Sequence, residues 1–225
     1  MPHADLPVSD RRTDALVRSI DAVAEGPIDW GRVFGNDGPV EVEIGVGKGR
    51  FLLLAASARP DTNFLGIEYA RKYAEKAVDR VAKRALVNVR VVHAEAVEFM
   101  RDRISDGSLA AVHAYFPDPW PKKRHHKRRF FRKETLDVLS RVLAPGGRLL
   151  AATDHDDYAA VIEETVGEHA AFETCLAAPG SEQAVIVPEF DELTAGGVTN
   201  FEIKYRREGR TIHGFSWKRR DERKR

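Results

Sequence analysis

The chain has 225 residues, of which 43% are hydrophobic, and its 36 basic and 35 acidic residues give a formal net charge of +1. This length can bury one sizeable core, so we expect a tail and short helix over residues 1–35 and a single domain over residues 36–225. The single cysteine excludes an intramolecular disulfide framework and a cysteine-rich zinc site.

Charge is unevenly distributed along the chain. Residues 122–133 contain eight Lys or Arg and no acid, and residues 203–225 contain ten Lys or Arg. The rest of the chain is therefore acidic. Two basic segments on an acidic body favour the binding of a polyanion at one defined surface, and nucleic acid becomes the leading class of partner.

The sequence carries no signal for membrane association. No apolar run approaches the length needed to span a bilayer. Charged residues near the N-terminus, among them Asp10, Arg11 and Arg12, stand where a signal peptide would need an apolar core. We therefore expect a cytoplasmic protein with no membrane partner.

The hydrophobic pattern predicts strands that alternate with helices from residue 40 onward. A loose tail and a helix over 13–25, closed by Gly26 and Pro27, come first. The expected strands cover 40–44, 63–67, 87–92, 109–115, 148–152 and 172–176, and the expected helices cover 50–58, 70–84, 96–104 and 131–143, with a turn at 145–147. Residues 200–206 and 211–218 are expected to form an antiparallel hairpin, followed by a frayed end.

This alternation predicts an α/β fold with a doubly wound, mostly parallel sheet and a C-terminal antiparallel hairpin. Such sheets bind ligands outside the carboxyl ends of their strands. An acidic residue lies at or just after the end of each of the first five strands, namely Glu43, Glu68, Glu95, Asp118 and Asp154. We interpret these carboxylates as candidates for a ligand site.

A glycine-rich turn with Gly45, Gly47 and Gly49 follows the first strand. Such a turn serves a dinucleotide or S-adenosylmethionine, and the glycines alone do not decide between them. A dinucleotide would bring an anionic pyrophosphate to this turn, where Glu43 would repel it. S-adenosylmethionine carries a sulfonium cation and an amino group, which carboxylates attract. Glu68 stands where a carboxylate accepts hydrogen bonds from ribose hydroxyls in either cofactor.

Residues 116–121 read Phe-Pro-Asp-Pro-Trp-Pro and run directly into the basic segment 122–133. Proline fixes its own φ and keeps the preceding residue out of the helical region, so the segment is expected to be an extended turn. This turn presents Asp118 to a ligand beside a cationic loop.

The chain resembles the tRNA (guanine-N7-)-methyltransferase family, which has the class I S-adenosylmethionine-dependent fold. The resemblance covers residues 40–217 and includes the segments 43–49, 66–68, 116–129, 152–154 and 199–204. The most specific of these is Phe-Pro-Asp-Pro-Trp-Pro-Lys-Lys-Arg-His-His-Lys-Arg-Arg at 116–129, whereas the glycine turn is common to most methyltransferases.

The resemblance implies a cofactor, a substrate and a set of site residues. The cofactor would be S-adenosyl-L-methionine, leaving S-adenosyl-L-homocysteine, without a metal, and the substrate a guanosine at position 46 of the tRNA variable loop. Residues implied at the cofactor are Glu43, Gly45, Gly47, Glu68, Glu95 and Asp118, with Asp118 also catalytic. Residues implied at the tRNA are Lys122, Asp154, Thr199, Asn200, Phe201 and Glu202.

The chemistry of guanine N7 sets the task of these residues. N7 has a free lone pair, so attack on a methyl group needs positioning and electrostatics rather than a strong base. Asp118 is the best candidate to follow the positive charge that develops on the base. Asp154 or Glu202 would select guanine, a contact typically worth about 1–3 kcal/mol, although Asp154 would alternatively cap the next helix. Trp120 or Phe201 would stack on the base, or else pack in the core.

Three other readings stay open at this point. An amino-methyltransferase acting on adenine uses an Asp/Asn-Pro-Pro-aromatic motif, which residues 117–120 match loosely. A nicotinamide-dependent oxidoreductase is opposed by Glu43 and by the basic loop. A non-catalytic RNA-binding module would bind tRNA with strong salt dependence but transfer no methyl group. The oligomeric state, monomer or homodimer, does not follow from the sequence.

Overall fold

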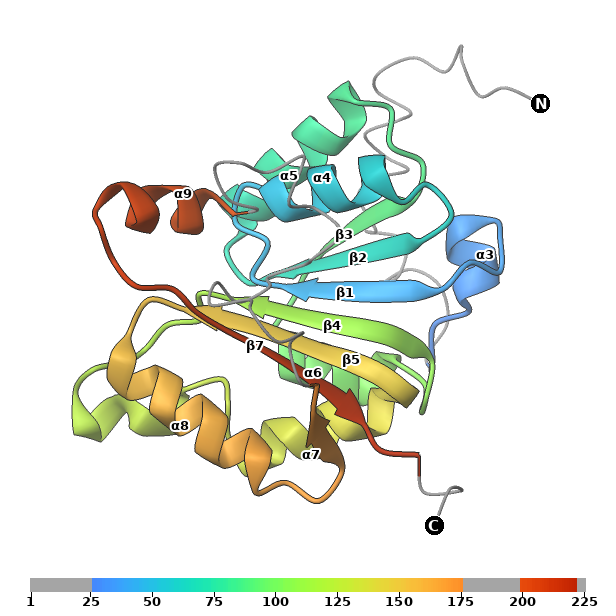
Figure 1. Cartoon of the computed structure of the whole chain (residues 1–225). Helices are drawn as coiled ribbons and strands as arrows, with labels where there is room; N and C mark the ends of the chain where they lie inside the picture. The colour runs from blue at the N-terminus through green and yellow to red at the C-terminus, as the bar shows by residue number, and fades with distance from the viewer. Residues whose placement is uncertain (1–25, 176–198, 222–225) are drawn as a thin grey trace. The chain divides into compact units, whose positions relative to one another are not determined.

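The computed structural model describes residues 26–175 and 199–221 (Figure 1). The chain divides into two compact units, residues 1–105 and 106–225. The helix expected at 13–25 lies outside the described residues. In the part that is described, no helix is both long and apolar enough to cross a bilayer.

The first unit contains three parallel strands in the order β3-β2-β1. The strands are β1 (Val40–Ile44), β2 (Asn63–Glu68) and β3 (Val89–His93), and the helices are α3 (Trp30–Phe34), α4 (Arg50–Ala58), α5 (Arg71–Lys83) and α6 (Ala96–Arg103). Every residue of β2 is buried, as expected of a central parallel strand. Helices α4 and α5 pack against these strands (Figure 1).

The second unit contains four strands in the order β4-β5-β7-β6. The strands are β4 (Leu109–Tyr115), β5 (Leu143–Thr153), β6 (Phe172–Thr174) and β7 (His213–Arg219), and the helices are the 3₁₀-helix η1 (Lys123–Arg128), α7 (Lys133–Val142), α8 (Asp156–Gly167) and α9 (Asn200–Arg207). Strands β4 and β5 are parallel, and β7 runs antiparallel to both β5 and β6. Helices α7 and α8 pack against β5 (Figure 1).

The expected α/β class, with mostly parallel strands and an antiparallel pair at the C-terminal end, is confirmed. The strand expected at 211–218 is found as β7, but the strand expected at 200–206 is wrong, because these residues form α9. Phe201, Ile203 and Tyr205 alternate as in a strand, yet Thr199 caps the start of a helix: its hydroxyl accepts a hydrogen bond from the Glu202 amide at 3.0 Å.

The turn expected at 145–147 is also wrong. These residues belong to β5, which begins directly after α7 at Leu143. Gly146 has a φ of 78°, and the register between β4 and β5 shifts between Leu109 and Ala111. The Pro-Gly-Gly sequence therefore makes an irregularity within a strand instead of a turn between two elements.

Candidate functional site

In the first unit, the turn after β1 is built on glycines in the left-handed region. Gly45 has a φ of 72° and Gly47 a φ of 52°, values that residues with a side chain rarely adopt. A Cβ atom added at either position would meet no heavy atom within 4 Å. The turn therefore borders open space on this side, which leaves room for a ligand close to the backbone.

Glu68, the last residue of β2, closes this turn. One carboxylate oxygen accepts a hydrogen bond from the Gly47 amide at 2.8 Å, and the other accepts one from the Ala70 amide at 2.8 Å. Its exposed fraction is only 8%. The carboxylate is thus held in place by backbone donors from two loops, with acceptor capacity left for ligand hydroxyls.

Glu43 on β1 is the most unusual carboxylate of the first unit. It is 4% exposed, and its Oε2 atom has no hydrogen-bond partner among the described residues. Burial and the nearby Glu68 carboxylate raise its pKa well above the ordinary value, against a backbone hydrogen bond from Leu52. A buried carboxylate of this kind is costly unless a cation or a hydrogen-bond donor completes it.

Glu95, between β3 and α6, has a structural role at the start of the helix. It is the N-cap of α6, and its Oε2 atom accepts a hydrogen bond from the Glu98 amide at 2.7 Å. The side chain is exposed, so its second oxygen remains accessible to a ligand.

In the second unit, the proline-rich turn after β4 is held by unusual backbone and side-chain contacts. Phe116 and Trp120 both have positive φ values, 53° and 42°, a conformation that costs roughly 1–3 kcal/mol and persists only where the surroundings impose it. Arg129 is buried and donates to the Pro119 carbonyl at 2.8 Å. As expected, no helix or strand covers residues 116–121, but Phe116 and Trp120, each before a proline, are not extended; Asp118 at the centre of the turn is exposed.

The N-terminal part of α9 brings aromatic rings to the start of this turn. Phe116 lies 6.3 Å from Phe201 and 5.6 Å from Tyr205, measured between ring centroids. Phe201 and Tyr205 are stacked at 5.9 Å with an interplanar angle of 26°. Phe201 remains 50% exposed, so part of its ring is accessible for stacking on a base.

Two carboxylates of the second unit are bonded to arginines. Asp154, just after β5, accepts a hydrogen bond from Arg210 at 2.7 Å. The Oε1 atom of Glu202 accepts two from Arg206, at 2.9 and 2.8 Å, and Glu202 is 3% exposed. Asp154 is therefore not the N-cap of α8, a role that His155 takes by accepting from the Tyr158 amide.

Tyr205 joins the carboxylates of this unit into one cluster. Its pKa is raised by burial first, then by Asp154 and, more weakly, by Asp118, while the Arg210 guanidinium opposes the shift. That guanidinium also lies over the Tyr205 ring at 4.5 Å. Asp154 is thus linked to Tyr205 through Arg210, and Asp118 follows β4, the parallel neighbour of β5.

The remaining predicted residues of the second unit lie around this cluster. Lys122 is exposed and precedes η1, and Asn200 is exposed in the first turn of α9. Thr199 is buried and caps α9, which is a structural role that the sequence interpretation did not assign to it. The described residues contain no group of three His, Cys, Asp or Glu side chains able to hold a metal ion.

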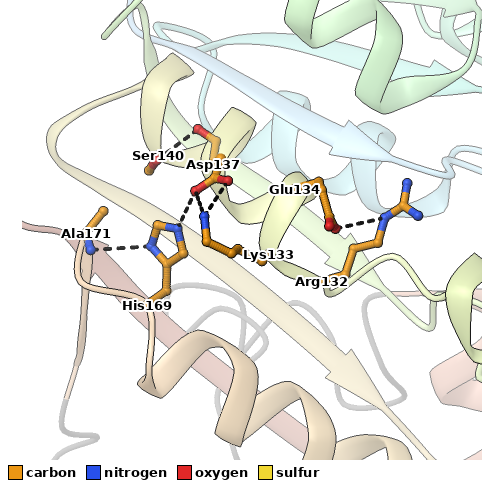
Figure 2. A network of polar contacts seen from close by, with 7 residues as sticks. All are labelled: Arg132, Lys133, Glu134, Asp137, Ser140, His169 and Ala171. Atoms are coloured by element: carbon orange, nitrogen blue, oxygen red, sulfur yellow. Dashed lines mark hydrogen bonds and ion pairs between the residues drawn. The ribbon is translucent and has the colours of Figure 1, made fainter.

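Two cations at the end of the basic segment 122–133 pair with acidic residues of α7. Figure 2 shows Lys133 paired with Asp137 at 2.9 Å, and Asp137 also accepts from His169 at 3.1 Å. Arg132 lies 3.8 Å from Glu134. A hollow of about 920 Å³ beside this network is lined by α7, the end of α8 and the end of β7, and it includes none of the predicted site residues.

Known proteins similar to this chain are methyltransferases. Residues 37–215 match the family model described as "Putative methyltransferase". A tRNA (guanine-N(7)-)-methyltransferase of Bordetella parapertussis is 43% identical over 164 residues, which make up 71% of this chain and 65% of that protein. One from Alkalilimnicola ehrlichii is 38% identical over 195 residues, 87% of this chain and 78% of that protein. The chain belongs to the tRNA (guanine-N7-)-methyltransferase family.

A solved structure similar to this family member is the S-adenosylmethionine-dependent O-methyltransferase of Thermotoga maritima. It has a TM-score of 0.50 and 14% sequence identity, and the match covers 90% of this chain and 70% of that chain. At this identity the likeness shows the class I methyltransferase fold alone. The chain covers less than two thirds of the length of the Bordetella relative.

Three side chains of this family member's second unit were not predicted from its sequence. Arg206 follows Glu202 by four residues, a spacing that would have indicated an ion pair once the helix was recognised. Arg210 bonds a carboxylate 56 residues away in the chain, and no local pattern signals that contact. Tyr205 was assigned to a strand, and its role in the cluster appears only with α9.

Proposed function

We propose that this chain transfers the methyl group of S-adenosyl-L-methionine to N7 of a guanosine in tRNA, at position 46 of the variable loop. The observation that carries the proposal is the contact of Asp154 with Arg210, whose guanidinium lies over Tyr205 on the aromatic surface of the second unit, in the same unit as the exposed Asp118 and the cationic loop that follows it. A purine base needs an aromatic surface and carboxylate acceptors, and an RNA strand needs cations.

The first unit fits S-adenosyl-L-methionine. Glu43 offers a buried carboxylate with an unpartnered oxygen, which suits a cationic ligand. Glu68 holds acceptor capacity for ribose hydroxyls, and the open side of Gly45 and Gly47 leaves space for the ligand. Glu95 would reach the adenine with the oxygen that does not cap α6. When bound, the cofactor supplies an electrophilic methyl group and leaves S-adenosyl-L-homocysteine.

The second unit would hold and orient the guanine. Because N7 carries a free lone pair, no residue has to remove a proton before transfer. Asp118 would stabilise the positive charge that appears on the base, and the resemblance also assigns it to the cofactor. Asp154 and Glu202, held by arginines, would accept hydrogen bonds from the N1 and N2 donors of guanine. The exposed ring of Phe201 would stack on the base.

The cationic residues would bind the tRNA backbone. Lys122 and the exposed cations of η1 would contact phosphates and supply affinity without sequence information. Asn200, exposed at the start of α9, would contact the nucleotide beside the target, with Thr199 fixing the helix that presents it. A tRNA substrate is consistent with an enzyme of the cytoplasm.

The test is to incubate the protein with methyl-labelled S-adenosyl-L-methionine and a tRNA that lacks 7-methylguanosine, then digest the RNA and identify the labelled nucleoside. Label is expected in 7-methylguanosine and is expected to disappear when G46 of the tRNA is replaced by A. Asp118→Asn and Asp118→Ala are expected to abolish the label, while Asp61→Asn, an exposed carboxylate of the first unit, retains it.

Each alternative predicts a different result. Label in a methylated adenosine would replace the base assignment by that of an amino-methyltransferase. Binding of tRNA without any label, unchanged by Asp118→Ala, would favour a non-catalytic RNA-binding module. Failure to bind S-adenosyl-L-methionine, together with binding of a nicotinamide dinucleotide, would favour an oxidoreductase.

A further inference from the structure

The outer face of α5 carries a stripe of three exposed lysines, and Asp79 lies between them on the same face. Lys72, Lys76 and Lys83 are spaced by four and seven residues, which places them within about 40° of one another around the helix axis. All three are exposed. The opposite face of α5 is apolar and buried against the strands of the first unit. The stripe spans about 16 Å along the helix axis.

Two acidic side chains of α5, Glu75 and Asp79, lie three or four residues from these lysines. In the part of the chain that the structure describes, none of Lys72, Lys76 and Lys83 forms an ion pair, whereas the neighbouring Arg71 pairs with Glu75. The pKa of Arg80, on the inner border of the stripe, is lowered by burial and then by the cations of Arg84 and Arg50. Arg80 and Arg84 thus add two cations at the end of α5, which a polyanion bound along the helix would also meet.

Two exposed tyrosines stand at the start of the stripe. Tyr69 is 75% exposed and directly follows Glu68, and Tyr73 is 42% exposed. The Lys76 ammonium lies 6.0 Å from the centre of the Tyr73 ring. Cations beside accessible aromatic rings are the usual means by which proteins bind unpaired RNA, since phosphates meet the cations and bases stack on the rings.

We propose that this α5 surface, formed by Tyr69, Lys72, Tyr73, Lys76 and Lys83, binds the sugar-phosphate backbone of the substrate RNA outside the methylated nucleotide. The proposal rests on the proposed function and adds a second RNA contact in the first unit. One strand of duplex DNA carries a phosphate about every 3.4 Å of helix axis, and phosphates are similarly close along an RNA strand, so a stripe of about 16 Å meets several. A lipid surface does not fit, because the apolar face that would enter a membrane is already buried.

The test is the salt dependence of tRNA binding by a variant with Lys72→Gln, Lys76→Gln and Lys83→Gln, measured with S-adenosyl-L-homocysteine present so that no turnover occurs. Each lost phosphate contact flattens the slope of log K against log salt by about 0.7 to 0.9. The triple variant is therefore expected to flatten it by about 2 to 3. Arg32→Gln, which removes an exposed cation of α3 in the same unit, is the matched control and is expected to leave the slope unchanged.

Steady-state methylation separates this surface from the catalytic site. The triple variant is expected to raise KM for tRNA at least tenfold at physiological salt, with kcat at saturating tRNA unchanged. Tyr73→Leu is expected to weaken binding of tRNA without changing the salt slope, because stacking releases no counterions.

Equal slopes and equal KM values in wild type, triple variant and Arg32→Gln would overturn the proposal while the proposed function stands, provided that the wild type methylates tRNA. A changed affinity of the triple variant for S-adenosyl-L-homocysteine alone would also overturn it. A wild type that neither binds nor methylates tRNA would refute the proposed function itself.

Discussion

The most informative single substitution is Glu43→Gln, which keeps the shape of a buried side chain but removes its charge. Glu43 has an unpartnered Oε2 atom and lies near the Glu68 carboxylate. We expect the variant to be more stable than the wild type at neutral and alkaline pH, and to bind S-adenosyl-L-methionine about 10- to 100-fold more weakly. That loss corresponds to one hydrogen bond to a charged group, about 1.5–3 kcal/mol.

The sign of the stability change follows from proton linkage. Burial, and then Glu68, raise the pKa of Glu43 well above its ordinary value of 4.5. Above pH 4.5 the unfolded chain releases this proton while the folded chain keeps it, so stability falls as the pH rises, until the folded pKa is passed. One retained proton corresponds to about 1.4 kcal/mol per pH unit. Gln binds no proton, so the variant lacks this slope across that window.

The assay is urea unfolding of both proteins at a series of pH values from 5 to 9, plotted as the difference in the free energy of unfolding. The difference is expected to grow with pH and then become constant. Glu41→Gln is the control, because Glu41 is buried but paired with Arg59 at 2.6 and 2.9 Å, so its loss is expected to destabilise the protein. Parallel pH curves for wild type and Glu43→Gln would refute the reasoning.

Three further outcomes are expected. Arg210→Met removes the hydrogen bond that Arg210 donates to the Asp154 carboxylate. It is expected to lower kcat/KM for tRNA about tenfold, or about 1.4 kcal/mol, without changing cofactor affinity. An equal loss of cofactor affinity would contradict this. Lys122→Ala is expected to weaken tRNA binding for all sequences and flatten the salt slope by about 0.7 to 0.9, and an unchanged slope would exclude a phosphate contact. The pKa of Asp137 is lowered from its ordinary value of 3.8, chiefly by Lys133, so its stabilising contribution is complete above about pH 4 and is lost as the pH falls further. Thermal unfolding of Asp137→Asn at a series of pH values below about 4 should therefore show a smaller pH dependence than wild type.

The sequence predicted elements well where an apolar pattern ended at a clear breaker. The strand at 109–115 and the helix at 50–58 have the boundaries that the pattern indicated. The first is a nearly continuous apolar run, and the second lies between a glycine and an Arg-Pro pair. In both elements the local sequence pattern and the tertiary packing favour the same secondary structure, so the local pattern alone predicts the boundaries.

The sequence failed where two local signals conflicted. In α9 the apolar alternation of residues 201–205 favours a strand, whereas Thr199 is a helix N-cap that accepts a hydrogen bond from the Glu202 amide. The helix prevails because Glu202 also pairs with Arg206 one turn later. The exposed fraction of Phe201 and the contact between Asp154 and Arg210 depend on that outcome, and neither can be read from spacing alone.

The basic face of α5 was also missed, because charge was counted along the sequence and not by helix face. The chain outside its two most basic segments is acidic in sum, yet α5 presents a stripe of lysines. The net charge of a segment does not show on which face of a helix its charges lie. In α5 the apolar face with Ala74, Ala77 and Val81 is buried, so the polar residues lie on the opposite face. Local geometry, not net charge, therefore decides where a polyanion would be held.

The carboxylates of the two units differ in a way that matches their proposed ligands. Among the described residues Glu43 forms no ion pair, and burial and Glu68 raise its pKa, so a cationic ligand such as a sulfonium would favour its ionised form. Asp154 and Glu202 each accept hydrogen bonds from an arginine, so their negative charge already has a cationic partner and they would serve as acceptors for a neutral base. If Glu43 were instead given an arginine partner by substitution of a neighbour, the same argument requires that cofactor affinity fall while the affinity for tRNA stays the same.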